Sequence, residues 1–286
     1  MFDLVKQMIN KVFGDGASKA VADSVYFQVN ESGEVWSFVS NIYDKYLVPI
    51  GFCILVFMFF YALTEKLSAE GFTFETAGKM IIKLLIFCGF MEIGLQLALG
   101  LLNISNAVIQ GINQDDFAAA ASKEAVDNVL ITLFGTTNPN FDGFWGTIAE
   151  FVMCGVAMVI MLLPWLVTLI CEALINIIIL TREIEIFARA AFMPVAIGDS
   201  YNGMSSGAVR YIKSFLAVCL QGALIVVILR ISSEMSMQYL IENMDADWTG
   251  LDATMSLVIM PIIFKIASAG LILKSLPLAK EICGTS

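Results

Sequence analysis

Five long apolar runs constrain this chain more than any other feature of its sequence. A helix needs about 20 mostly apolar residues to cross roughly 30 Å of hydrocarbon. Runs of about this length cover residues 46–63, 80–102, 148–180, 214–232 and 254–273. We therefore predict an all-α fold, a polytopic transmembrane helix bundle with about five spans.

The overall composition excludes an ordinary soluble domain. Hydrophobic residues make up 58 % of the 286 residues, and charged residues only 15 %. Soluble chains carry about 25 % charged residues, which keep their surface in water. The net charge of −10 is also a poor match to a surface that would neutralise nucleic-acid phosphates.

The third apolar run is too long for a simple span. As a helix, residues 148–180 would extend for about 50 Å, and Pro164 removes one backbone hydrogen bond within it. We favour one long kinked helix that projects beyond the membrane, and two re-entrant halves are the alternative. The shorter apolar stretch 184–197 predicts an interfacial or re-entrant helix.

The distribution of Lys and Arg outside the spans predicts the orientation. Segments 64–79, 181–213 and 274–286 hold eight basic residues in 62, whereas 1–45, 103–147 and 233–253 hold five in 111. The first set is therefore expected in the cytoplasm, with the N-terminus out and the C-terminus in. The predicted parts are an extracytoplasmic tail (1–45), the bundle (46–273) with an extracytoplasmic loop (103–147) and a cytoplasmic loop (181–213), and a cytoplasmic tail (274–286).

The predicted outer segments contain two further candidate helices. Within the N-terminal tail, one helical face carries the apolar residues Phe2, Val5, Ile9, Val12 and Phe13. This amphipathic helix would either lie in the membrane interface or on a partner, or cap the chain's own bundle. The central loop contains a second predicted helix at 118–135.

The sequence offers no catalytic or metal-binding constellation. It contains no histidine, none of its six cysteines forms a CxxC pair, and no aspartate lies in the five spans. Gly203–Gly207 matches G-x-S-x-G, but that motif needs a histidine base, so we interpret it as a polar turn. We predict a protein that is not an enzyme and that has no cofactor, metal or catalytic residue.

Charged residues inside the apolar runs are the main candidates for a functional site, because charge is costly in lipid. Glu92 lies near the middle of the second run, Lys265 past the middle of the fifth, and Glu172 toward the cytoplasmic end of the third. A Glu92–Lys265 pair between helices, oligomer contacts, an aqueous lumen and an ion pathway are the open alternatives.

Four basic residues of the predicted inner face form a second candidate set. Arg182, Arg189, Arg210 and Lys213 would bind acidic lipid headgroups or dock a cytoplasmic partner. The alternative is that they only follow the orientation rule.

The stretch from the end of the third run through the fourth resembles a known family. Its features are a long helix that leads into Arg189-Ala-Ala-Phe-Met-Pro194, a polar turn, and a span that runs from Tyr211-Ile-Lys-Ser-Phe through Leu220-Gln221-Gly222. These features are similar to the TrbL-like (VirB-six-like) polytopic subunits of conjugative type IV secretion systems. The resemblance covers about 55 residues in motif and most of the chain in predicted topology.

The resemblance implies a channel or platform subunit of the bacterial cytoplasmic (inner) membrane that helps translocate DNA or protein. It implies a homo-oligomeric ring, pentameric by analogy with the family, that contacts a stalk protein outside the membrane and secretion ATPases in the cytoplasm. DNA would then be a transient cargo, and membrane lipids would surround the ring. A small-solute transporter or ion channel is the alternative function.

Overall fold

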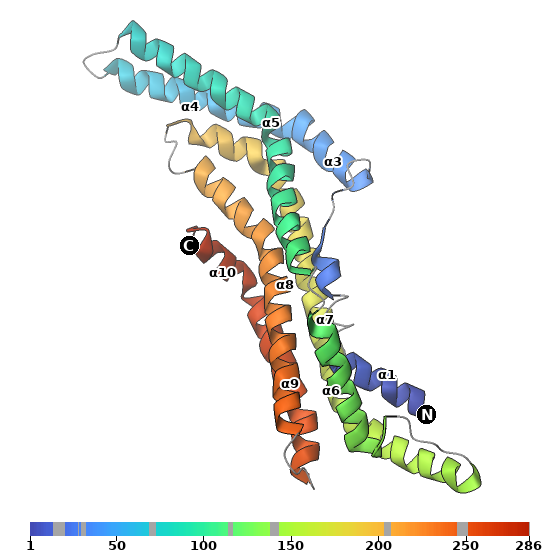
Figure 1. The fold of residues 1–286 in the computed structure, drawn as a ribbon. Coiled ribbons are helices and arrows are strands. Elements are labelled where there is room, and N and C mark those ends of the chain that lie inside the picture. Colours follow the sequence, from blue (N-terminus) through green and yellow to red (C-terminus); the bar gives the residue numbers. More distant parts are fainter. Residues whose placement is uncertain are drawn as a thin grey trace. The chain divides into compact units, whose positions relative to one another are not determined.

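The computed structural model describes residues 1–13, 21–27, 29, 33–68, 73–113, 117–137, 143–202, 207–244 and 251–285. All regular structure in these ranges is helical, as predicted (Figure 1). Besides a helical turn at 21–25, the elements are α1 (Phe2–Phe13), α3 (Glu34–Ile42), η1 (Tyr43–Leu47), α4 (Val48–Ser68), α5 (Phe74–Asn113), α6 (Phe117–Phe134), α7 (Gly143–Asp199), η2 (Ser200–Asn202), α8 (Ala208–Met244), α9 (Leu251–Leu273) and α10 (Ser275–Ile282).

Four helical segments of the described residues are long and apolar enough to cross a membrane. They are Glu34–Ser68, Phe74–Ile112, Gly146–Asp199 and Ala208–Tyr239. A fifth span results if Ile259–Leu273 and Ser275–Ile282, which meet at a bend of 50°, are counted as one. The chain is therefore a multi-pass membrane protein with four to five candidate spans, which agrees with the predicted number.

The long third span is longer than the sequence suggested. Helix α7 has 57 residues and passes Pro164 without a break, so the alternative of two re-entrant halves is wrong. At 1.5 Å per residue it is about 85 Å long. Residues 184–197 continue this helix and do not form a separate interfacial one, because no helix-breaking residue stands between Leu180 and Ile184. The kink at Pro164 stays a prediction.

The predicted outer loop is mostly helical in its described residues, and the last part of the predicted N-terminal tail is helical too. In the predicted outer loop 103–147, α5 continues to Asn113, α6 matches the helix predicted at 118–135, and α7 begins at Gly143. The predicted boundary between tail and bundle at 45/46 falls inside η1, which joins α3 and α4 into one helical segment. Apolar composition located the membrane-spanning cores but not the helix ends, because polar residues extend a helix as readily as apolar ones.

Backbone contacts divide the chain into two compact units. Unit 1 contains Met1–Tyr26, Ile109–Ile179 and Ala223–Ser275. One of its apolar clusters joins α1 and α6 to α7, through buried residues such as Ile9, Leu130 and Met161. A second cluster joins the turn at 21–25 to α7, α8 and α9, with Ile175, Ile225 and Ile272 among its buried side chains.

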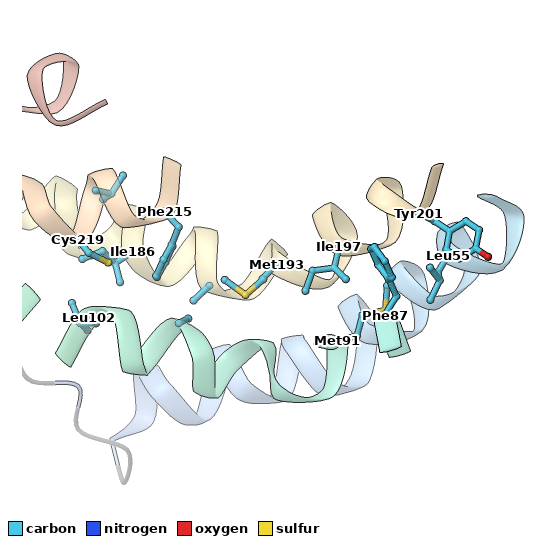
Figure 2. Close-up of a cluster of buried hydrophobic side chains, with 13 residues drawn as sticks. Leu55, Phe87, Met91, Leu102, Ile186, Met193, Ile197, Tyr201, Phe215 and Cys219 are labelled. Carbon is cyan, nitrogen blue, oxygen red and sulfur yellow. The ribbon is translucent and has the colours of Figure 1, made fainter. Parts of the chain in front are cut away.

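Unit 2 contains Phe27–Val108, Leu180–Gly222 and Leu276–Ser286. Within it, α4 and the first part of α5 lie side by side as a helical hairpin (Figure 1). Its main cluster is shared by α4, α5, α7 and α8, and Figure 2 shows Met193 and Ile197 pointing from α7 toward α5. Gly51 lets α4 approach α7 closely, since a Cβ there would lie 2.6 Å from the Pro194 carbonyl oxygen.

Candidate functional site

The most unusual surface in unit 2 is a polar stripe on α5. Six exposed residues that are polar or small follow one another at steps of three or four: Gly89, Glu92, Gln96, Gly100, Asn103 and Ala107. At 100° per residue all six lie within about 80° of one another around the helix. We call this set the α5 stripe.

The rest of α5 shows that the α5 stripe faces away from the core of unit 2. The opposite side of the helix carries the buried residues Met91, Ala98 and Leu102. Phe90 and Val108, exposed by 46 % and 41 %, belong to an apolar strip beside the stripe. A charged side chain that faced lipid at mid-span would cost on the order of 3 kcal/mol. The stripe therefore has the chemistry of a surface that meets water or another helix.

A second polar site is a small cavity in unit 1, with a volume of about 30 Å³. Besides apolar side chains, the cavity is lined by the polar residues Thr168 and Glu172 of α7, Ser232, Ser233 and Ser236 of α8, and Lys265 and Ser268 of α9. This volume has room for about one water molecule. Two of the hydroxyls bond to backbone: Ser268 Oγ donates to the Lys265 carbonyl oxygen at 2.9 Å and Ser232 Oγ to that of Phe264 at 3.5 Å.

Glu172 is held in this cavity by an ion pair with α1. One carboxylate oxygen, Oε2, lies 3.2 Å from the Lys11 ammonium of α1. The other oxygen, Oε1, is buried without a hydrogen-bond partner. Pairing with Lys11 offsets part of the cost of holding the carboxylate among apolar helices, and the second oxygen leaves a place for a donor such as water.

The Lys11–Glu172 ion pair also fixes the N-terminal helix α1 on α7. The N-terminal ammonium of Met1 lies 3.3 Å from Glu150, which is 22 residues before Glu172 on α7. Between these two ion pairs, the apolar face of α1 packs on α6 and α7 with Val5 and Ile9 fully buried. Of the two predicted roles for this amphipathic helix, the structure therefore supports packing on the chain's own bundle.

The three charged candidates from the apolar runs separate into two groups. Glu172 and Lys265 line the same cavity of unit 1, a convergence that the sequence did not predict. Glu92 belongs to unit 2, where it is exposed on the α5 stripe. The proposed Glu92–Lys265 pair thus stays a prediction.

Arg182 does not lie on a surface, although it was predicted as a lipid- or partner-binding residue. Its side chain is 1 % exposed, and it donates from Nε to the Val218 carbonyl oxygen at 3.2 Å and from Nη2 to that of Cys219 at 3.1 Å. Gly222 makes this contact possible, because a Cβ at that position would overlap the guanidinium group. A buried, already bonded guanidinium has no room for a headgroup, so Arg182 joins α7 to α8 instead.

Arg189 also connects these two helices. Its Nε lies 2.9 Å from Glu185 Oε1 on the same helix, and its Nη1 donates to Ser214 Oγ of α8 at 2.5 Å. The Tyr211 hydroxyl of α8 donates to the Arg189 carbonyl oxygen at 2.5 Å. In contrast, Arg210 and Lys213 are exposed on the first turns of α8, where they remain candidates for a ligand or partner.

One cation contact was missed by the sequence reasoning. Lys83 of α5 donates to the Tyr201 carbonyl oxygen, and its ammonium lies 4.7 Å from the centre of the Tyr201 ring. The Tyr201 hydroxyl donates to the Met80 carbonyl oxygen at 2.9 Å, and burial raises the pKa of this phenol. An aromatic residue in a polar turn gave no sequence signal for such a contact, because the partners are about 120 residues apart.

Metal and catalytic chemistry find little support in the part of the chain that the structure describes. Within it, no cluster of three or more Cys, Asp or Glu side chains could hold a metal ion. The central residues of the G-x-S-x-G match, 203–206, lie outside the described residues. The predicted absence of catalytic residues is therefore still a prediction.

Comparisons with known proteins do not place this chain in a family. No protein-family model, no curated protein and no solved structure matches it.

Proposed function

We propose that this chain is a non-catalytic channel or platform subunit, which assembles with copies of itself in the bacterial cytoplasmic membrane and helps move DNA or protein across it. The type IV secretion subunits that the sequence resembles are the model for this function. The observation that carries the proposal is the α5 stripe, in which Glu92, Gln96 and Asn103 are exposed along one face of a membrane-spanning helix.

The α5 stripe supports assembly because a lone copy would expose it to lipid. Water in a shared lumen or a neighbouring helix would relieve the cost of the Glu92 carboxylate. Gly89 and Gly100 favour such a contact, since a Cβ at either position would meet no other atom within 4 Å. Small residues at these positions let a second helix come close.

A strain that lacks the gene tests this proposal by complementation. We expect the wild-type chain to restore conjugal transfer, and a variant with Glu92→Leu, Gln96→Leu and Asn103→Leu to restore at most about a tenth of it at equal protein amount. Phe90→Leu, on the neighbouring apolar strip, is the matched control and should restore full transfer. Native mass spectrometry of the detergent-solubilised protein should show several copies per particle. A strictly monomeric protein whose deletion leaves transfer unchanged would contradict the proposal.

A second candidate function is a small-solute transporter or ion channel. The cavity of unit 1 favours it, because Glu172 has an unpartnered buried oxygen beside serine hydroxyls. This alternative requires that Glu92→Gln or Glu172→Gln lowers flux in a liposome assay. The channel-subunit proposal expects both variants to leave small-solute flux at the level of empty liposomes.

A further inference from the structure

A pocket in unit 2 has the chemistry of a ligand site that the proposed function does not use. It lies between α5, α7 and α8, and its volume is about 170 Å³. All of its lining residues are apolar side chains or glycine, among them Leu97 of α5, Ile197 of α7 and Ile212 of α8. We call it the apolar pocket.

The floor of the apolar pocket is made by buried groups that pack against one another. Phe87, Met193 and Ile197 are buried, and Figure 2 shows the two α7 side chains pointing toward α5. Gly94 is also buried in the lining, and a Cβ there would lie 2.5 Å from the Tyr43 hydroxyl and 3.3 Å from the Met193 sulfur. The groups behind the floor are therefore already in close contact, and the pocket is a fixed part of the packing of unit 2.

The mouth of the apolar pocket opens on the outer surface of unit 2. Ile86, Phe90 and Val209 line it and are exposed by 49 %, 46 % and 43 %. Phe90 belongs to the apolar strip of α5, so the mouth is continuous with an apolar surface of the candidate span Phe74–Ile112. The α5 lining residues, 86–97, lie in the middle of the apolar run 80–102. In a multi-pass membrane protein, hydrocarbon is therefore the medium that meets the mouth.

The lining of the apolar pocket determines the chemistry of its occupant. Apolar cavities of about 150 Å³ stay free of water and bind apolar molecules of the size of benzene. Water, an ion or a lipid headgroup would find no hydrogen-bonding side chain here, and burying a polar group without a partner is costly. If the pocket stayed empty, its lining would lose the dispersion contacts of a close-packed interior. The favoured occupant is therefore hydrocarbon.

We propose that the apolar pocket binds a segment of one phospholipid acyl chain, which enters through the mouth from the surrounding bilayer. An acyl chain is the apolar molecule that a membrane supplies at the middle of a span, and its flexibility lets it bend into a pocket beside a helix. Binding depends on the acyl chain and not on the headgroup, because the lining offers contacts to hydrocarbon alone. The inference depends on membrane insertion and not on the transport role.

Photo-crosslinking of the full-length protein tests the proposal. The protein is reconstituted with a phospholipid that carries a diazirine in its acyl chain, solubilised and diluted in detergent to remove loosely held lipid, and then irradiated. Mass spectrometry of peptides should find the label on residues 86–97 and 208–212. Ala208→Phe, which places a ring in the pocket, should lower this label at least about tenfold. Val159→Phe, an equally large change on the exposed face of α7, is the matched control and should change nothing.

Two arms on the wild-type protein test the acyl chain without any substitution. Phosphatidylethanolamine, phosphatidylglycerol and phosphatidylcholine with the same labelled chain should give the same labelling within about twofold. Excess unlabelled phosphatidylcholine should displace the label, whereas glycerophosphocholine, which has the headgroup without the chains, should not.

Four results would overturn the proposal. They are a strong headgroup preference, displacement by glycerophosphocholine, unchanged labelling of a folded Ala208→Phe variant, and label spread evenly over all exposed apolar positions of the spans. A pocket without label, together with disulfide crosslinking of Phe90→Cys between copies, would also overturn it, because a second copy would then cover the mouth.

Discussion

Replacing Gly222 with alanine would place a methyl group where the Arg182 guanidinium now lies, because a Cβ there overlaps that group. The guanidinium is 1 % exposed and donates to two backbone carbonyl oxygens of α8, at 3.2 and 3.1 Å. A hydrogen bond from a charged group contributes about 1.5–3 kcal/mol. The substitution itself gains about 1 kcal/mol in helix propensity. With two such bonds lost, we therefore expect a net loss of about 2–5 kcal/mol in the free energy of unfolding.

A double-mutant cycle separates this effect from a general loss of packing. Arg182→Met removes the guanidinium, and the two carbonyl oxygens keep their bonds within α8, so this variant should lose only about 1–2 kcal/mol. In the Arg182→Met background, Gly222→Ala should be neutral or slightly stabilising.

Unfolding in mixed micelles with increasing SDS, followed by circular dichroism, measures these differences. Gly155→Ala on α7 is the control, because a Cβ there meets no other atom within 4 Å. It should stabilise the protein by up to about 1 kcal/mol. The reasoning is refuted if Gly222→Ala is as stable as Gly155→Ala, or if the effects of Gly222→Ala and Arg182→Met simply add.

Three further predictions follow from individual contacts. The Tyr43 hydroxyl donates to a buried backbone carbonyl of α5 at 2.5 Å, so Tyr43→Phe should lower the free energy of unfolding by about 1 kcal/mol in the same SDS titration. Glu172→Gln removes the charge that holds Lys11, so hydrogen exchange of the α1 amides should become faster, and unchanged exchange would show that the pair is not needed. Burial raises the pKa of Cys283 and Lys213 lowers it, so the thiol should react with maleimide more slowly at pH 8 than an unperturbed cysteine. Lys213→Gln should slow that reaction further, and a faster one would contradict the electrostatic assignment.

The sequence predicted the parts of this fold that depend on local pattern. Apolar runs located the four to five candidate spans, and helical periodicity predicted α1 and its buried face. The ends of the helices could not be predicted in the same way. Residues such as Thr181 and Arg182 are polar, but they are compatible with a helix, so α7 continues through them.

The polar contacts were harder to predict because their partners are distant in the sequence. Glu172 was identified as a candidate, but its partner Lys11 lies 161 residues earlier on another helix. Arg182 was predicted to be a surface residue of the inner face. Its burial depends on Gly222, because a glycine without a side chain leaves space for the guanidinium against α8. Of the α5 stripe, the sequence indicated only Glu92. The other residues could be assigned only once the burial of each neighbouring position on α5 was known.

Single cysteines measure most directly whether the α5 stripe contacts water or a neighbouring copy and not lipid. They are introduced into a variant that lacks the six native cysteines. Gln96→Cys and Asn103→Cys lie on the stripe, and Phe90→Cys and Val108→Cys lie on the apolar strip beside it. A membrane-impermeant, water-soluble thiol reagent and a bifunctional crosslinker are applied to native membranes. We expect the two stripe cysteines to react with the reagent or to crosslink between copies, and the two control cysteines to do neither. Equal behaviour of all four positions would contradict the account.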